Sequence, residues 1–454
     1  MTTVTDLVKP NSGISIHWNL LFTFWVLVLF LSASACQQTS SQKPETMPSS
    51  HVDSLLTRDQ LADKVLGLLV GSAIGDAMGA PTEMWDRMSI RIEYGHIDTM
   101  DVHVREASPE GPWDYNLPAG GTTDDTRWKK LAADYLIAQA AGADSLDSRA
   151  FGQHIIDTYL DYIKTLKTTD SFEPEPFERA LRRMTWLQEW ALVAKPYVEG
   201  DYENYMTALN RFYGGDLACA GMLYAPMVGL YYPGHPEKAY AEGYRLGIFD
   251  HGYARDITGL TAALTAAAAG YNSSPEENFD VIRQIDPHEF FRSRLLGRSA
   301  YRIYREARNI AYEAKNYEPG SSKLDSLLLP RRWKASRMLF AQREKAFDLL
   351  DSKLQDAPFH AGEIWLITLT GMMMHDWEFL PAMEFIINYG RDNDTTGAVA
   401  GAILGAYHGA SALPPDLKEL VLKTSRETLD IDLEQTAEQL TEAIWKRHPG
   451  FQEI

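Results

Sequence analysis

Apolar residues recur at helical spacing along most of the chain after residue 56. The segment TRDQ (57–60) is a capping-box pattern, and Leu61, Val65 and Leu68 follow it on one helical face. Similar stripes predict further helices over 128–138, 151–166, 177–193, 256–269, 362–374 and 378–389. There is no convincing run of alternating apolar and polar residues, which would indicate strands. The pattern therefore predicts an all-α fold.

Two further segments, 288–315 and 331–354, are amphipathic and strongly charged. They separate two otherwise compact regions of the chain. We expect them to form a charged helical insertion, shaped like a lid or hairpin, over about 282–356. The domain that carries this insertion is expected to extend over 55–445.

Glycines recur every four residues in two of the apolar segments. Glycine inside a helix costs about 1 kcal/mol relative to alanine, so a repeated series indicates a face that another backbone approaches closely. Positions four apart share such a face. We expect both segments to be tightly packed central helices, for example packed on each other; two ordinary Gly/Ala-rich helices are the alternative. The last members of the first series could instead lie in the loop that follows. The two series are Gly67, Gly71, Gly75, Gly79 and Gly397, Gly401, Gly405, Gly409.

The first 35 residues are expected to be an export signal rather than part of the fold. LLFTFWVLVLFL (20–31) is too short to span a bilayer comfortably and matches the apolar region of a signal peptide. Ala33 and Ala35 suit cleavage before Cys36, as in a bacterial lipoprotein, although leucine is usual at Ala33. An uncleaved anchor helix is the alternative. We expect lipidation of Cys36, a polar tether over 36–54, and an exported chain at the periplasm or outer surface, anchored to a bacterial membrane.

Composition and charge narrow the choice of partners. Of 454 residues, 45% are hydrophobic, which is ample for a sizeable core. The formal net charge of −19 disfavours nucleic acid as a partner. The negative net charge does not exclude a small anionic ligand, because metal ions and backbone N–H groups can hold phosphates. The two cysteines, Cys36 and Cys219, exclude a disulfide framework and a cysteine-based zinc site.

Three short segments combine acids, glycines and threonines: GDAMGAPTE (75–83), GGTTDDT (120–126) and GRDNDTTG (390–397). The first is expected just after a helix and the others just before one. Neighbouring acids converge only at a turn or a helix start, where a single acid is usually an N-cap. Paired acids exceed what capping needs, and clustered carboxylates repel one another unless a cation offsets them. Oxygen-only donors favour Mg²⁺, Mn²⁺ or Ca²⁺ over zinc, and this set could hold two ions.

In this order the three segments resemble the motifs of the ADP-ribosylglycohydrolase family. Its members carry G-D-A-x-G-x-P-x-E, then T-D-D-T, then D-x-D-[ST] before a Gly/Ala-rich helix; here these are GDAMGAPTE, TDDT (123–126) and DNDT (392–395). The resemblance covers most of residues 60–412. It implies a compact orthogonal helical bundle with a dinuclear magnesium centre, for which Mn²⁺ is an alternative ion. It also implies cleavage of the C1 ribosyl bond in small-molecule or protein-linked ADP-ribose derivatives.

The resemblance further implies roles for individual residues. Glu83 or Asp125 would be the general base for the attacking water. Carboxylates suit this chemistry because an oxocarbenium-like transition state needs nearby negative charge and an oriented nucleophile. The expected metal ligands are Thr123, Asp124, Asp125, Asp392, Asp394 and Thr395. The expected substrate contacts are Asp76, Gly120, Gly121 and Tyr224.

The chain also departs from the family pattern. Arg391 stands where a second glycine is usual, and Tyr224 stands where many members have arginine before an Ala-Pro pair. These departures fall where the distal part of a ligand would be contacted, so they affect the expected identity of the substrate. Two alternative functions therefore stay open. One is a hydrolase of nucleosides or other small N- or O-glycosides; the other is a non-catalytic ADP-ribose-binding protein. The loop DHGYARD (250–256) could line the pocket, or Asp256 could be a plain N-cap.

Overall fold

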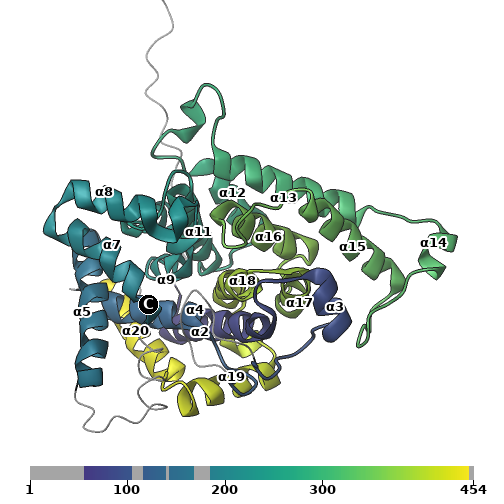
Figure 1. Cartoon of the computed structure of the whole chain (residues 1–454), viewed down its shortest axis with the longest axis horizontal. Coiled ribbons are helices and arrows are strands. Elements are labelled where there is room, and N and C mark those ends of the chain that lie inside the picture. Colours follow the sequence, from purple (N-terminus) through teal and green to yellow (C-terminus); the bar gives the residue numbers. More distant parts are fainter. Residues whose placement is uncertain (1–55, 105–115, 140–142, 168–184, 449–454) are drawn as a thin grey trace, which may run out of the picture. The chain divides into compact units, whose positions relative to one another are not determined.

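The computed structural model describes residues 56–104, 116–139, 143–167 and 185–448, all within one compact unit. The expected signal, tether and Cys36 lie outside these residues. The described part is almost entirely helical, which confirms the predicted all-α fold (Figure 1). Its α-helices are α2 (Arg58–Gly79), α3 (Arg87–Glu93), α4 (Asp124–Ile137), α5 (Ser148–Lys167), α7 (Gln188–Glu199), α8 (Tyr202–Arg211), α9 (Ala225–Leu230), α10 (Pro236–Leu246), α11 (Ala254–Ala268), α12 (Pro275–Gln284), α13 (Ser299–Lys315), α14 (Ser321–Asp325), α15 (Arg337–Asp351), α16 (Ala361–Met374), α17 (Phe379–Tyr389), α18 (Asn393–His408), α19 (Pro415–Glu427) and α20 (Leu433–Arg447).

Short elements complete the described part. Two two-residue strands, β1 and β2, pair antiparallel. β1 is Trp85–Asp86 and β2 is Gly390–Arg391. The 3-10 turns are Ala80–Thr82, Phe212–Gly215, Ala220–Leu223, Phe290–Arg292 and Ala410–Ala412.

Helices α2 and α18 form the centre of the fold and pack antiparallel through their glycines. A Cβ placed on Gly71 would lie 2.3 Å from the carbonyl oxygen of Gly401, and one on Gly75 would lie 2.0 Å from that of Gly397. Because only glycine allows this approach, the spacing in both series is a packing requirement, as predicted. The segment Arg58–Thr82 is long and apolar enough to cross a membrane, but 94% of its most apolar window is buried inside this domain.

The start of α2 follows the prediction and its end does not. Thr57 and Gln60 form the reciprocal capping box, with hydrogen bonds of 3.2 and 2.9 Å. The helix continues to Gly79 instead of ending before the first acidic segment. Asp76 therefore lies inside the last turn of α2, because Gly75 and Gly79 remain packed against α18.

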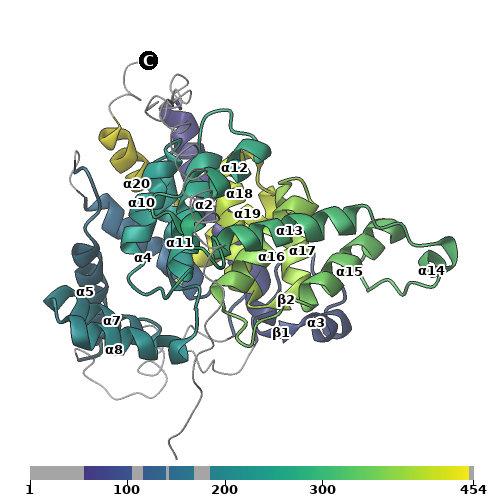
Figure 2. The same cartoon turned by 90° about the horizontal axis from the view of Figure 1, so that it is seen from above.

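The expected insertion forms two long helices, α13 and α15, which pack on each other, with the short α14 between them in sequence (Figures 1 and 2). The first helix begins at Ser299 rather than near residue 288. Arg298 turns inward just before it and forms a buried ion pair of 2.6 Å with Asp256. Asp256 is consequently a buried partner within α11 and not its N-cap, which is Tyr253. Helix α15 begins at Arg337, after its N-cap Ser336.

Candidate active site

The ends of α2 and α17 meet the start of α18 at a buried group of acids. Glu83 follows the turn after α2, Asp392 is the N-cap of α18, and Asp394 lies in the first turn of α18. All three are buried, and one carboxylate oxygen from each lies within 4.8 Å of the others. Two of the three acidic segments, more than 300 residues apart in sequence, thus converge on one point.

A small cavity of about 30 Å³ adjoins this group. It is space for about two water-sized occupants, since one water needs roughly 10–15 Å³. Asp124 from the start of α4 contributes to the same cavity, so all three acidic segments reach it. Its lining comprises Glu83, Asp124, Trp190, Tyr213, Ala218, Cys219, Ala220, Leu223, Phe359, Asp392, Asp394 and Thr395.

The chemistry of this donor set fits a hard divalent cation. Carboxylates and a threonine hydroxyl are oxygen donors of the kind that Mg²⁺ and Mn²⁺ take, and the cavity lining carries no histidine. Burial, together with the negative charges of Asp125 and Asp394, raises the pKa of Asp76 to about 7. Asp125 and Asp394 add to the effect of burial, and a divalent cation would offset their negative charge.

Asp76 connects α2 to the start of α4. Its carboxylate accepts hydrogen bonds from the Thr123 amide at 2.8 Å, and from the amide and hydroxyl of Thr126 at 3.0 and 2.6 Å. Asp76 is fully buried, and both of its oxygens are used in this way. It therefore positions the start of α4 in this structure, and a substrate contact by Asp76 stays a prediction.

Gly120 and Gly121 form the turn that leads into α4. Gly120 has a φ of +86° and packs against Leu420 and Thr424, while Gly121 packs against Leu117. Neither glycine lines the acidic cavity. In this structure they shape the turn before Thr123, the N-cap of α4, and their expected substrate contacts stay predictions.

Asp125 is held by two side chains from different helices. Its Oδ1 accepts from the ammonium group of Lys129 at 2.9 Å, and its Oδ2 accepts from the hydroxyl of Thr395 at 2.8 Å. Lys129 and Asp125 are both buried. Lys129 was not among the predicted site residues, although a lysine four residues after an aspartate on one helix face is a recognisable signal.

A second ion pair lies directly beside the acids and was also missed. Arg391 donates from Nε to Oε1 of Glu363 at 2.7 Å and from Nη2 to Oε2 at 3.1 Å. The Met84 amide donates to the carbonyl of Arg391 at 2.7 Å, next to the pairing of β1 with β2. This contact places the residues after Glu83 and before Asp392 side by side. Glu363 lies on α16 in an apolar stretch, and no local pattern indicates its partner.

Tyr224 does not lie where a ligand contact was expected. It is fully buried, its hydroxyl donates to the Leu246 carbonyl at 2.8 Å, and its ring packs against Trp128 and Phe151. The tyrosine thus fills the core behind the cavity. Its ring reaches the apolar interior in this structure, and a substrate contact by Tyr224 stays a prediction.

The loop around Asp250 supports one wall of the cavity instead of lining it. Asp250 accepts from the Gly221 amide and the Thr258 hydroxyl, both at 2.8 Å. These bonds anchor the turn that carries Cys219 into the cavity lining. Burial and neighbouring carboxylates raise the pKa of the Cys219 thiol, so the thiol stays neutral.

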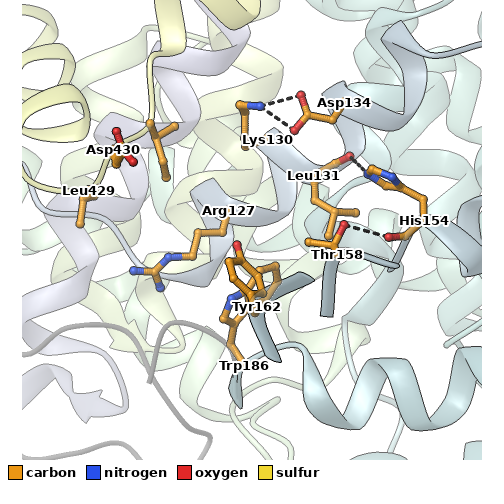
Figure 3. Close-up of a pocket in the computed structure, with 11 residues that line it drawn as sticks. Arg127, Lys130, Leu131, Asp134, His154, Thr158, Tyr162, Trp186, Leu429 and Asp430 are labelled. Carbon is orange, nitrogen blue, oxygen red and sulfur yellow. Dashed lines mark hydrogen bonds and ion pairs between the residues drawn. The ribbon is translucent and has the colours of Figure 1, made fainter. Parts of the chain in front are cut away.

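A larger cavity of about 290 Å³ lies further along α4. Arg127 contributes to it one helical turn after Asp124, and Figure 3 shows Arg127 and the Lys130–Asp134 ion pair projecting from α4. Its lining combines basic, acidic and aromatic side chains: Arg127, Lys130, Leu131, Asp134, His154, Thr158, Tyr162, Trp186, Leu429, Asp430 and Ile431.

Comparisons with known proteins identify the family of this chain. A relative, the uncharacterized protein YegU of Escherichia coli (strain K12), is 31% identical over 104 residues. That match covers 22% of this chain and 28% of the relative. A solved structure, an ADP-ribosylglycohydrolase-related protein complex, covers 86% of this chain and 99% of its own at 18% identity and a TM-score of 0.48. The ADP-ribosylglycohydrolase family model matches residues 57–450. The chain therefore belongs to the ADP-ribosylglycohydrolase family of hydrolases.

Proposed function

We propose that this protein is a metal-dependent glycohydrolase that cleaves the C1 ribosyl bond of ADP-ribose derivatives. The observation that carries the proposal is the meeting of three acidic segments at one buried cavity, with Glu83, Asp392 and Asp394 within 4.8 Å of one another. Such a group is costly to bury unless a cation offsets it. Family membership supplies the reaction class, hydrolysis of a glycosidic bond.

Magnesium is the proposed cofactor, as two ions, with Mn²⁺ as an alternative. Asp124, Asp392, Asp394 and Thr395 line the cavity and would hold the ions. Thr123 and Asp125 are the remaining proposed ligands; in the present arrangement Asp125 holds the Thr395 hydroxyl. A bound ion supplies a fixed position for ribose hydroxyls and a more acidic water.

Glu83 is the better-placed candidate for the general base. It lines the cavity, whereas both oxygens of Asp125 already accept hydrogen bonds from Lys129 and Thr395. A base must lie within hydrogen-bond reach of the water from which it takes a proton. The negative charge of the neighbouring aspartates would stabilise the positive charge that develops at C1 as the bond to the leaving group breaks.

The larger cavity along α4 is the proposed location for the part of the substrate beyond the ribose. It begins one helical turn from Asp124, and its lining includes the guanidinium of Arg127 for negatively charged groups, whereas Lys130 is paired with Asp134. The aromatic side chains of Tyr162 and Trp186 could contact a base or another planar group. A nucleoside hydrolase is the second candidate, favoured by the burial of Tyr224, which removes it from the expected distal contacts.

We also propose that the chain is exported and lipidated at Cys36. The support is the sequence alone: the apolar run 20–31 and the small residues before Cys36. Metabolic labelling with a palmitate analogue tests this directly. Label should reach the wild-type protein and be lost from Cys36→Ala; equal labelling of both would refute lipidation at Cys36.

Calorimetric titration with Mg²⁺ tests the metal site. The wild-type protein should bind Mg²⁺, and Asp394→Asn should weaken binding by more than about 100-fold, beyond the loss typical of groups around ligands. Asp416→Asn is the matched control, because Asp416 is an exposed acid in the first turn of α19. Equal Mg²⁺ affinity of wild type and Asp394→Asn would overturn the metal assignment.

A further inference from the structure

A cavity of about 750 Å³ lies between α15 and the turn that joins α16 to α17. This volume is within the range of small-molecule sites in proteins. It shares no lining residue with the acidic cavity or with the cavity along α4. The apolar part of its lining, here called the apolar wall, is contributed from both sides and comprises Trp333, Leu339, Met374, Leu380, Pro381 and Phe385.

A buried cation contributes to the cavity on the α15 side. Arg343 is 7% exposed, and its Nε has no hydrogen-bond partner among the described residues. The nearest acid is Glu344 at 3.7 Å, which also pairs with Arg87 at 3.2 Å and Arg91 at 3.5 Å. Burial lowers the pKa of Arg343 to about 10. Its positive charge is therefore poorly compensated by the protein itself.

The remaining contacts of Arg343 fix the geometry of this side. Its Nη1 lies 3.0 Å from Nδ1 of His96, and Nε2 of His96 lies 3.0 Å from Glu384. Since a guanidinium can only donate, Nδ1 of His96 accepts and Nε2 donates to Glu384. Trp333 covers the guanidinium at 4.3 Å from its ring centre. Glu384 therefore already accepts a hydrogen bond from His96.

Two further acids at the cavity form ion pairs, and the fourth, Glu378, is exposed to solvent. Asp98 pairs with Arg332 at 2.5 Å and with Lys334 at 2.8 Å, and Asp376 pairs with Lys315 at 2.7 Å. These pairs leave Arg343 as the buried charge that lacks a close carboxylate. The lining carries four basic and four acidic side chains, and the buried donor that an entering anion would meet is Nε of Arg343.

The opposite wall contains a second buried polar atom without a partner, at a strained turn. Nε2 of His375 has no hydrogen-bond partner within the described part of the chain. Asp376 and Trp377, which follow it, have φ values of +48° and +66°. Non-glycine residues rarely adopt this region, and such strain is often stored at ligand sites.

We propose that this cavity binds a small organic anion, with a carboxylate that compensates Arg343 and an aromatic or aliphatic body that covers the apolar wall. The proposal does not depend on the metal centre or on hydrolysis. Aromatic monocarboxylates are the ligand class that matches both features, because a larger polyanion would leave the apolar wall exposed to water.

Calorimetric titration of the full-length purified protein with naphthoate tests the proposal. Naphthoate should bind with a stoichiometry of one, and the neutral analogue naphthalenemethanol should bind at least about tenfold more weakly, a difference equal to one charge-assisted contact. EDTA should leave naphthoate binding unchanged, which separates this site from any metal-bound anion.

Substitutions at Leu339 locate the binding. Leu339 lines the cavity and is 52% exposed, so a charged residue is compatible with folding there. Leu339→Glu should weaken naphthoate binding about tenfold by charge repulsion, and Leu339→Lys should not. Leu354→Glu is the matched control, because Leu354 is 42% exposed and lies outside the cavity.

Each outcome of these titrations either supports the proposal or overturns it. Binding that is selective for the anion and weakened only in Leu339→Glu supports the proposal. No saturable binding, equal binding of the neutral analogue, or equal affinity of Leu339→Glu and Leu354→Glu would overturn it.

Discussion

Arg391 and Glu363 form a bidentate ion pair one residue before Asp392. Arg391 has a φ of +66°, a conformation that costs a non-glycine residue roughly 1–2 kcal/mol. Glu363 is buried and also accepts from the Gln355 amide at 2.7 Å. The pair therefore ties the start of α18 to α16, at the position where related sequences are expected to have glycine.

Removal of this ion pair should lower the affinity of the acidic cavity for Mg²⁺ more than it lowers the stability of the fold. We expect Arg391→Gly, which also relieves the backbone strain, to lower Mg²⁺ affinity about tenfold, as is typical for groups that orient metal ligands. Glu363→Gln should change the affinity in the same direction. Calorimetry gives the affinity and thermal denaturation gives the stability. Unchanged Mg²⁺ affinity in both variants would show that the pair has only a structural role; Arg426→Ala, which removes an exposed ion pair, is the control.

The glycine contacts between α2 and α18 predict a large loss of stability on a minimal substitution. Gly71→Ala would place a Cβ 2.3 Å from the Gly401 carbonyl oxygen, so the two central helices would have to separate. We expect a loss of at least about 3 kcal/mol in the free energy of unfolding, measured by denaturant titration. Gly320→Ala, in open space at negative φ, should cost less than about 1 kcal/mol. Equal losses would contradict the proposed close packing.

Lys129 should matter because it offsets a buried charge. Lys129→Met leaves Asp125 without its cation, and breaking one partner of a buried ion pair costs about 3–5 kcal/mol. The double variant Lys129→Met with Asp125→Asn should recover part of that loss, because the uncompensated charge is then absent. Denaturant unfolding of the four proteins in the cycle measures the coupling. Additive losses would mean that Lys129 and Asp125 do not interact.

His375 should make the protein sensitive to moderate acid. Burial, with Lys315 and Arg343 nearby, lowers its pKa from 6.5 to about 4, while Asp376 acts in the opposite direction. The folded state thus binds this proton more weakly than the unfolded chain. Its contribution is fully present above pH about 6.5 and is lost as the pH falls towards 4, by up to about 3 kcal/mol.

Unfolding measured across this pH range tests the role of His375. His375→Gln should flatten the dependence of stability on pH between about 6.5 and 4. His288→Gln, at an exposed histidine, is the control. If His375→Gln kept the full acid sensitivity, another group would be responsible.

Periodic features of the sequence predicted the fold well. The glycine spacing predicted the contact between α2 and α18, because a close approach of two helices requires small residues at a fixed interval. The TRDQ pattern predicted the start of α2 for a similarly local reason. The ordered acidic segments predicted which parts of the chain would share a site.

Features that depend on long-range partners were not predictable in this way. The start of α13 is displaced because Arg298 turns inward to Asp256, 42 residues earlier. The burial of Tyr224 depends on Trp128 and Phe151 from two other helices. Glu363 becomes part of the site only because Arg391 reaches it across the fold. No local pattern indicates such contacts. The pair of Lys129 with Asp125, in contrast, could have been predicted, because residues four apart on a helix lie on the same face.

Release of ADP-ribose is the measurement that tests the central claim most directly. The purified protein would be incubated with ADP-ribosylated arginine and serine peptides, O-acetyl-ADP-ribose and nucleosides, and the released sugar would be followed by mass spectrometry. We predict ADP-ribose release that requires Mg²⁺, stops with EDTA and falls by more than about 100-fold in Asp394→Asn. If only nucleosides were cleaved, the proposed site would stand, and the function would be that of the second candidate, a nucleoside hydrolase. Release that survives both EDTA and Asp394→Asn would contradict the proposed metal-dependent mechanism.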